Sequence, residues 1–222
     1  MKVNIRKYIF DIEDDHVSWF WPMVNNNKWE TFSLDCIQNN SGKTFWDFGA
    51  WIGPISLYAS KVFGKVISWE PDYKAYNMFL KNIKNNNITN IELNRTGIYN
   101  KETTLSFGEG GTGRGSSTSS INCSNNSDLY SIRTTTIEKC LEKYGEPDFV
   151  KIDIEGAEEY IIDHLLEYKF KNILIETHFH QINKPKIFNE KIKELISFYD
   201  VTNKNGSINE IKVNDIFFMK KL

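Results

Sequence analysis

The chain has 222 residues, of which 40 % are hydrophobic, enough to bury a sizeable core in a single domain covering residues 1–222. A net charge of −2 leaves no basic excess for nucleic acid, which we therefore exclude as the first choice of partner. The three scattered cysteines indicate neither disulfides nor zinc, and without a signal peptide or a membrane-spanning run we expect a cytoplasmic protein.

Residues 1–40 are predicted to form an N-terminal lid or helical extension. Segment 29–38 has the pattern of an amphipathic helix, and the preceding residues are rich in Trp and Phe. Trp19, Trp21 and Trp29 are candidates for closing a pocket, and plain core packing is the competing interpretation.

The stretch "TFWDFGAWIG" at 44–53 predicts a buried strand that ends in a glycine turn and leads into a helix. Such a turn presents backbone N–H groups and the positive end of a helix dipole to a ligand. Gly49 and Gly53 lack a Cβ and would allow close approach, with Ala50 and Trp51 between them and Asp47 just before.

An acidic residue, Glu70, follows the next predicted strand (66–69), where a carboxylate can accept both hydroxyls of a ribose. NAD and S-adenosylmethionine both use this pattern. The turn lacks the G-x-G step that admits a pyrophosphate, and Trp51 would crowd one. We therefore expect an adenosine ligand with a small zwitterionic tail, whose carboxylate lies near the turn amides and whose amino group lies near Asp47.

The segment "FGEGGTGRGSSTSS" at 107–120 has no periodicity and predicts a flexible loop over 108–127. A solvated insertion and a flap that closes over substrate explain it equally well.

Two acids follow the predicted strand 149–154, in "KIDIEGAE". Asp153 and Glu155 alternate with isoleucines, so both carboxylates should point to one side at the carboxyl edge of the sheet, where open α/β sheets bind ligands. Glu155 could instead cap the helix that begins near Ala157.

The next predicted strand, 172–176, ends in "ETHFH", which places Glu176 and His178 on one side. Together with Asp153, which we also expect to contact the cofactor, they suggest two chemistries. His178 or an acid could accept the proton of an attacking hydroxyl, which is the interpretation we favour. Alternatively, Asp153, Glu176 and His178 could hold a divalent ion such as Mg²⁺.

The alternation of short apolar runs with longer patterned segments predicts an α/β fold around a mainly parallel sheet with helices on both faces. An Asn205-Gly206 turn near the end adds an antiparallel hairpin. The predicted strands are 44–48, 66–69, 91–93, 149–154 and 172–176, and the predicted helices are 54–63, 73–85, 157–166 and 185–197.

Four segments resemble the FkbM family of S-adenosylmethionine-dependent methyltransferases: "WDFGAWIGPISLYAS" (46–60), "VISWEPD" (66–72), "VKIDIEGAEEYII" (150–162) and "ILIETH" (173–178). The resemblance implies a class I methyltransferase fold, Rossmann-like with seven strands, and methylation of a hydroxyl on a sugar, glycan or small metabolite. It also implies that Glu30 and Pro71 contact the cofactor. Trp51 stands where a small polar residue is usual. A binding module without turnover and an NAD-dependent oxidoreductase remain the alternatives.

Overall fold

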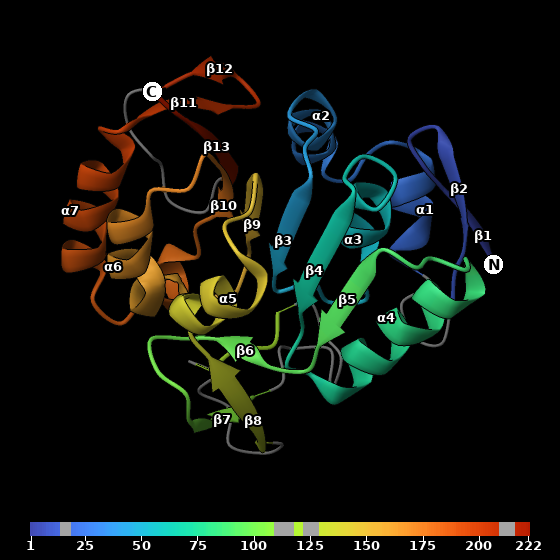
Figure 1. Cartoon of the computed structure of the whole chain (residues 1–222), viewed down its shortest axis with the longest axis horizontal. Coiled ribbons are helices and arrows are strands. Elements are labelled where there is room, and N and C mark those ends of the chain that lie inside the picture. Colours follow the sequence, from blue (N-terminus) through green and yellow to red (C-terminus); the bar gives the residue numbers. More distant parts are fainter. Residues whose placement is uncertain (14–18, 109–117, 122–128, 209–215) are drawn as a thin grey trace.

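A computed structural model describes residues 1–13, 19–108, 118–121, 129–208 and 216–222. Within these ranges the chain forms one eight-stranded sheet, a two-stranded hairpin and a three-stranded sheet (Figure 1). From edge to edge the large sheet contains β12 (Gly206–Ser207), β11 (Tyr199–Asn203), β13 (Ile216–Lys221), β10 (Asn172–Glu176), β9 (Phe149–Ile152), β3 (Thr44–Phe48), β4 (Lys65–Trp69) and β5 (Ile91–Asn94).

The inner strands are apolar because both faces of the sheet are covered by helices. In β3, Phe45 belongs to one core cluster and Trp46 to the other, as the two-residue period of a strand requires. The first face packs against α2 (Thr31–Asn39), α3 (Pro54–Ala59) and α4 (Tyr73–Asn85), and the second against α5 (Ile137–Tyr144), α6 (Glu158–Tyr168) and α7 (Pro185–Ile196). The predicted α/β architecture is confirmed.

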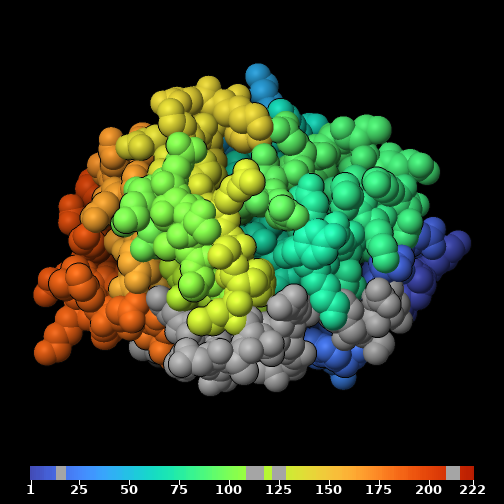
Figure 2. All heavy atoms as spheres, turned by 90° about the horizontal axis from the view of Figure 1, so that it is seen from below, coloured from blue at the N-terminus to red at the C-terminus, as the bar shows by residue number. Residues whose placement is uncertain are grey.

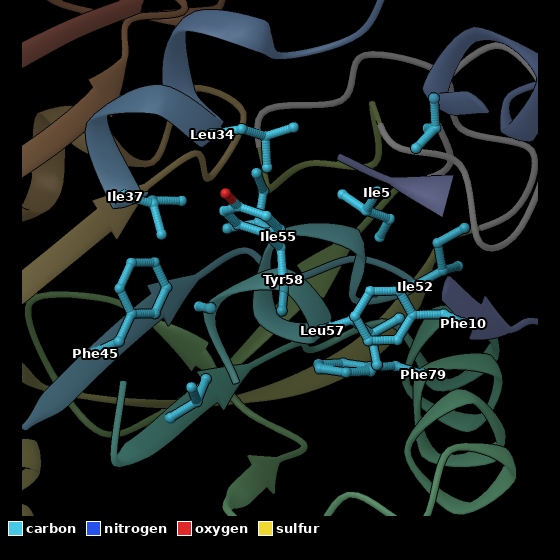
Figure 3. Packing of buried hydrophobic residues seen from close by; sticks show 14 of the residues in the cluster. Ile5, Phe10, Leu34, Ile37, Phe45, Ile52, Ile55, Leu57, Tyr58 and Phe79 are labelled. Carbon is cyan, nitrogen blue, oxygen red and sulfur yellow. The ribbon is translucent and has the colours of Figure 1, made fainter. Parts of the chain in front are cut away.

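The first forty residues contain a β-hairpin, β1 (Lys2–Ile5) and β2 (Tyr8–Asp11), followed by the short helix α1 (Trp21–Asn25) and by α2. Ile5 and Phe10 of the hairpin pack into the first core cluster beside Ile52, Leu57 and Phe79 (Figure 3). The extension is therefore integrated with the core and includes strands that the sequence pattern did not indicate.

A second sheet lies across the carboxyl edge of the large one (Figure 1), and the space-filling view in Figure 2 looks onto this face. It consists of β6 (Gly97–Ile98), β8 (Tyr130–Thr135) and β7 (Thr104–Phe107). The predicted loop 108–127 falls mostly outside the described residues. At its margins Gly108 pairs with Ser120 in an isolated bridge.

Several predicted boundaries differ from the structure, most of them by one or two residues. β9 ends at Ile152 rather than at 154, and the chain turns shortly afterwards at Glu155, whose backbone is left-handed (φ 52°). α3 ends at Ala59 rather than at 63. The predicted C-terminal turn joins β11 to the two-residue β12, which adds an eighth strand to the expected seven, while β13 inserts antiparallel between β10 and β11.

No helix within the described ranges has both the length and the apolar character needed to cross a bilayer.

Candidate active site

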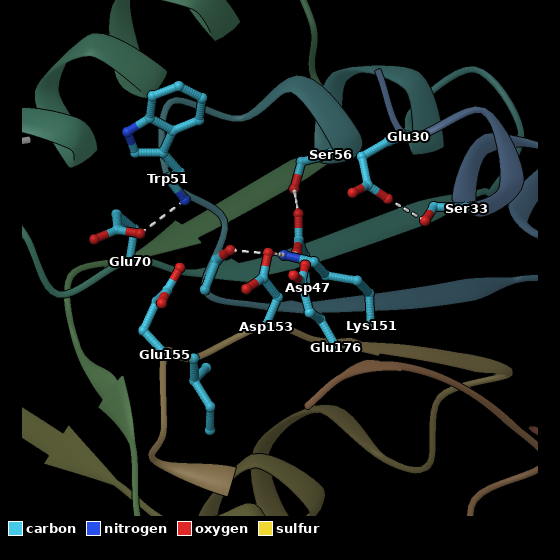
Figure 4. A network of polar contacts seen from close by, with 12 residues as sticks. Glu30, Ser33, Asp47, Trp51, Ser56, Glu70, Lys151, Asp153, Glu155 and Glu176 are labelled. Atoms are coloured by element: carbon cyan, nitrogen blue, oxygen red, sulfur yellow. Dashed lines mark hydrogen bonds and ion pairs between the residues drawn. The ribbon is translucent and has the colours of Figure 1, made fainter. Parts of the chain in front are cut away.

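The carboxyl ends of β3, β4, β9 and β10 meet beside a pocket of about 330 Å³. Polar side chains from several elements converge there (Figure 4). Its charged lining residues are Glu30, Glu70, Lys151, Asp153, Glu155 and Glu176. Its apolar wall includes Trp19, Phe20, Met23, Trp29, Trp51, Ile55, Pro71, Ile98, Leu105, Phe107 and Ile132.

Gly49 and Gly53 in the turn after β3 lie too close to neighbouring atoms of the protein to carry a side chain. A Cβ on Gly49 would lie 1.8 Å from the Asp153 carbonyl oxygen, and one on Gly53 would lie 2.1 Å from the Phe79 ring. Both glycines have positive φ, and so does Trp51 between them. Gly49, Ala50 and Trp51 line the pocket, whereas Gly53 lies outside the lining.

Glu70 is held rigidly at the pocket wall. Its Oε2 accepts a hydrogen bond from the Trp51 N–H (2.7 Å) and its Oε1 accepts one from the Asp72 N–H (2.8 Å). Burial raises the pKa of Glu70 to about 8, although both amide hydrogen bonds favour the ionised form. Each carboxylate oxygen retains a lone pair for a ligand hydroxyl. Pro71, the next residue, also lines the pocket.

Asp47 is fully buried and does not line the pocket. Its Oδ2 accepts a hydrogen bond from the Ser56 hydroxyl (2.5 Å), and its Oδ1 lies 3.4 Å from the Lys151 Nζ. Burial raises the pKa of Asp47, and the Lys151 charge partly opposes that shift. The expected contact between Asp47 and a ligand amino group has no direct path in this arrangement.

Lys151 is a site residue that the sequence reasoning missed. It lies on β9, and its Nζ donates to the Gly49 carbonyl oxygen (2.8 Å) and lies 3.1 Å from Asp153 Oδ2. Burial lowers the pKa of Lys151, but the charges of Asp153 and Asp47 outweigh burial and raise it. The available signal was a lysine inside an otherwise apolar buried strand, since such a charge is costly unless it is paired.

The structure brings the four proposed catalytic residues together. His178 Nε2 lies 3.7 Å from Asp153 Oδ1, 3.5 Å from Glu155 Oε2 and 3.7 Å from Glu176 Oε1. The three acids line the pocket, whereas His178 is buried behind them, outside the lining.

A fully buried carboxylate, Glu158, orients this histidine. Its Oε1 lies 2.9 Å from His178 Nδ1 and also accepts a hydrogen bond from the Ile154 N–H (3.2 Å). Nδ1 is therefore the nitrogen that carries a proton, and Nε2 faces the acids. The sequence pattern contained no signal for this role, because an acid in the first turn of a helix is ordinary.

The cluster shifts its own pKa values. Burial and the neighbouring Asp153 charge raise the pKa of Glu155 to about 7 and that of Glu176 to about 8, against the opposing effect of His178. Burial lowers the pKa of His178, but its contacts with Glu158, Asp153 and Glu155 outweigh burial and raise it to about 10. The histidine therefore carries the positive charge that keeps the acids together.

Asp153, Glu176 and His178 also have the composition of a metal site. One ligand atom from each lies within 4.8 Å of the others, a spread that a divalent cation could draw together. The other nitrogen of the histidine faces a carboxylate, as is common around metal-bound histidines.

The N-terminal segment supplies an aromatic wall and one more acid. The Phe20 ring packs edge-on against Trp29 (5.0 Å between centroids) and Trp51 (4.7 Å). Trp19 is 55 % exposed at the pocket. Glu30 accepts a hydrogen bond from the Ser33 hydroxyl, and burial raises its pKa. Trp21 is buried in the core and does not line the pocket, as its packing interpretation expected.

Solved structures share this fold. A precorrin-6y C5,15-methyltransferase from Geobacter metallireducens is 15 % identical with a TM-score of 0.52, over 96 % of this chain and 95 % of that one. A candidate methyltransferase from Streptococcus mutans, in complex with SAH (S-adenosylhomocysteine), is 13 % identical with a TM-score of 0.50, over 86 % and 96 %. The fold is thus that of class I methyltransferases.

A methyltransferase FkbM from Methylobacillus flagellatus KT is 18 % identical with a TM-score of 0.49, over 82 % of this chain. This chain spans 44 % of that protein's length. A search of curated proteins finds no match. The sequence model of the methyltransferase FkbM domain matches residues 35–206, most of the chain, which includes the glycine turn, Glu70 and the acid cluster. The chain therefore belongs to the FkbM methyltransferase family.

Proposed function

We propose that the protein transfers a methyl group from S-adenosylmethionine to a hydroxyl oxygen of a small acceptor. The observation that carries the proposal is one pocket that joins Glu70 and the glycine turn to the carboxylates of Asp153, Glu155 and Glu176. A ribose acceptor and a set of proton acceptors thus line the same space.

The residues present suit this cofactor. Glu70 is fixed by two amide hydrogen bonds and can accept the ribose hydroxyls, and Trp51 leaves a turn too crowded for a pyrophosphate. When bound, S-adenosylmethionine supplies an electrophilic methyl group on a positively charged sulfur. A wall of carboxylates is electrostatically favourable beside such a charge.

The acids on the wall orient and deprotonate the acceptor. A carboxylate of Asp153, Glu155 or Glu176 would accept the proton of the acceptor hydroxyl, whose oxygen would take the methyl group that S-adenosylmethionine supplies and leave SAH as the other product. His178, held by Glu158, keeps these acids in place from behind. Alignment of oxygen, carbon and sulfur accounts for much of the rate.

The walls of the pocket support a sugar, a glycan or another small hydroxylated metabolite as acceptor. The exposed Trp19 offers an aromatic face for the C–H groups of a ring, and the acids offer hydrogen-bond acceptors for its hydroxyls.

The test is transfer of radiolabel from methyl-labelled S-adenosylmethionine to a panel of sugars, glycans and hydroxylated metabolites. Wild type should label at least one acceptor, and Glu176→Gln should reduce the rate while SAH still binds. An NAD-dependent oxidoreductase would instead bind NADH and not SAH. Binding of SAH by wild type with no labelling of any acceptor would favour a binding module.

A divalent cation is the alternative source of hydroxyl activation, and the grouping of Asp153, Glu176 and His178 favours it. With direct base catalysis, activity survives dialysis against EDTA. Loss of activity that Mg²⁺ or Mn²⁺ restores would replace the general base by a bound metal.

A further inference from the structure

The described lining of the pocket has more acidic than basic side chains. Among its described lining residues, five carry a carboxylate and Lys151 alone carries an ammonium or guanidinium group. S-adenosylmethionine ends in an α-amino acid, which bears one carboxylate and one ammonium group. In this lining, Lys151 is therefore the residue with which a ligand carboxylate can form an ion pair.

Four backbone N–H groups of the glycine turn are already used within the protein. The N–H groups of Gly49 and Ala50 donate to the Trp69 carbonyl oxygen (3.1 and 3.0 Å), and that of Gly53 donates to the Ala50 carbonyl oxygen (2.9 Å). The Trp51 N–H donates to Glu70 (2.7 Å). These amides already have acceptors, so the expected role of the turn as a carboxylate binder is weak in this geometry.

Lys151 and Asp153 form a pair of opposite charges beside the turn. Their closest atoms are 3.1 Å apart, and both residues line the pocket. The Asp153 side chain is 31 % exposed and that of Lys151 is 10 % exposed, so a ligand can reach the pair. The Gly49 carbonyl oxygen anchors the lysine from the other side (2.8 Å).

We propose that Lys151 and Asp153 together bind the zwitterionic end of the cofactor, with its carboxylate on Lys151 and its ammonium on Asp153. This assignment rests on the proposed function. An α-amino acid carries its two charges close together, so it can bridge an adjacent cation and anion. Asp47, enclosed by Ser56 and Lys151, then supports the lysine from beneath instead of binding the ligand itself.

The test is calorimetric binding of three nucleosides to wild type and to Lys151→Met. They are SAH, decarboxylated SAH, and 5′-methylthioadenosine, which lacks the amino-acid tail. Wild type should prefer SAH to the decarboxylated form by about ten- to a hundredfold, the range for a charge-assisted contact. The variant should lose this preference and bind 5′-methylthioadenosine as wild type does.

Lys151→Arg is the matched control, because it keeps the charge and should keep most of the preference. If Lys151→Met weakens all three ligands equally, or keeps the preference for SAH, the lysine is only structural and the proposal is overturned. If Lys151→Met does not fold, Lys151→Met/Asp47→Asn removes the uncompensated buried charge and is used in the same comparison. Failure of wild type to bind any of the nucleosides would instead refute the proposed function.

Discussion

The ionisation of Glu70 should control how tightly the protein binds an adenosine ligand. Both of its carboxylate oxygens already accept backbone N–H groups, at 2.7 and 2.8 Å, so a proton on either oxygen would use a lone pair that a ribose hydroxyl needs. The ligand therefore selects the ionised form. Because the pKa of the buried group is raised from 4.5 to about 8, that form is scarce in the free protein near neutral pH.

The affinity for 5′-methylthioadenosine should then rise about tenfold from pH 6 to pH 7 and roughly fivefold more to pH 8, before it levels off. This ligand has no amino-acid tail whose own titration would interfere. The assay is calorimetry across this range in buffers of different ionisation enthalpy, which also counts the proton released on binding. A flat pH profile in wild type, or the same slope in Glu70→Gln, would mean that the ionisation of Glu70 does not control binding.

The raised pKa of Glu70 also makes the free energy of unfolding depend on pH. The folded-state pKa lies above the unfolded one, so the folded protein binds this proton more tightly. The resulting stabilisation is fully present below about pH 4.5 and is lost as pH rises through about 8. Relative to Glu70→Gln, wild type should lose about 4 kcal/mol in free energy of unfolding between pH 5 and pH 9, measured with urea.

Three further changes test the packing and the pocket. Gly49→Ala should destabilise the fold by about 3 kcal/mol, because its Cβ would overlap the Asp153 carbonyl oxygen and its φ is positive; an unchanged melting temperature would contradict the close approach. Glu158→Leu should cost about 3 kcal/mol in urea unfolding, because it leaves the buried His178 without its partner; full stability would mean that this histidine is neutral. Trp19→Ala should raise the KM of the acceptor without changing the affinity for SAH, since the ring is exposed at the pocket; equal losses in both would place Trp19 against the cofactor.

The bounds predicted from the sequence are most accurate for β3, β10 and α4. β3 and β10 have the predicted bounds because continuous apolar runs flanked by turn residues leave little choice of register. The predicted helix at 73–85 also matches α4, which Asp72 caps by accepting from the Lys74 and Ala75 amides. Local signals and tertiary packing agree in these places.

The small sheet and the polar network were harder to predict from the sequence. β6, β7 and β8 are short and contain no continuous apolar run, so their sequences alone provided little indication of strands. The roles of Lys151 and Glu158 depend on partners distant in sequence, since Gly49 lies 102 residues before the lysine and His178 lies 20 residues after the glutamate. Only the fold brings those atoms together.

The position of β13 has a consequence for the order in which the fold can assemble. β11 joins the large sheet through β13, although it precedes β13 in the chain. During synthesis on the ribosome, β11 therefore cannot join the large sheet until residues 216–221 have emerged. Before that point the edge of β10 is unpaired. Until then the open edge of β10 can pair with other chains or be bound by chaperones.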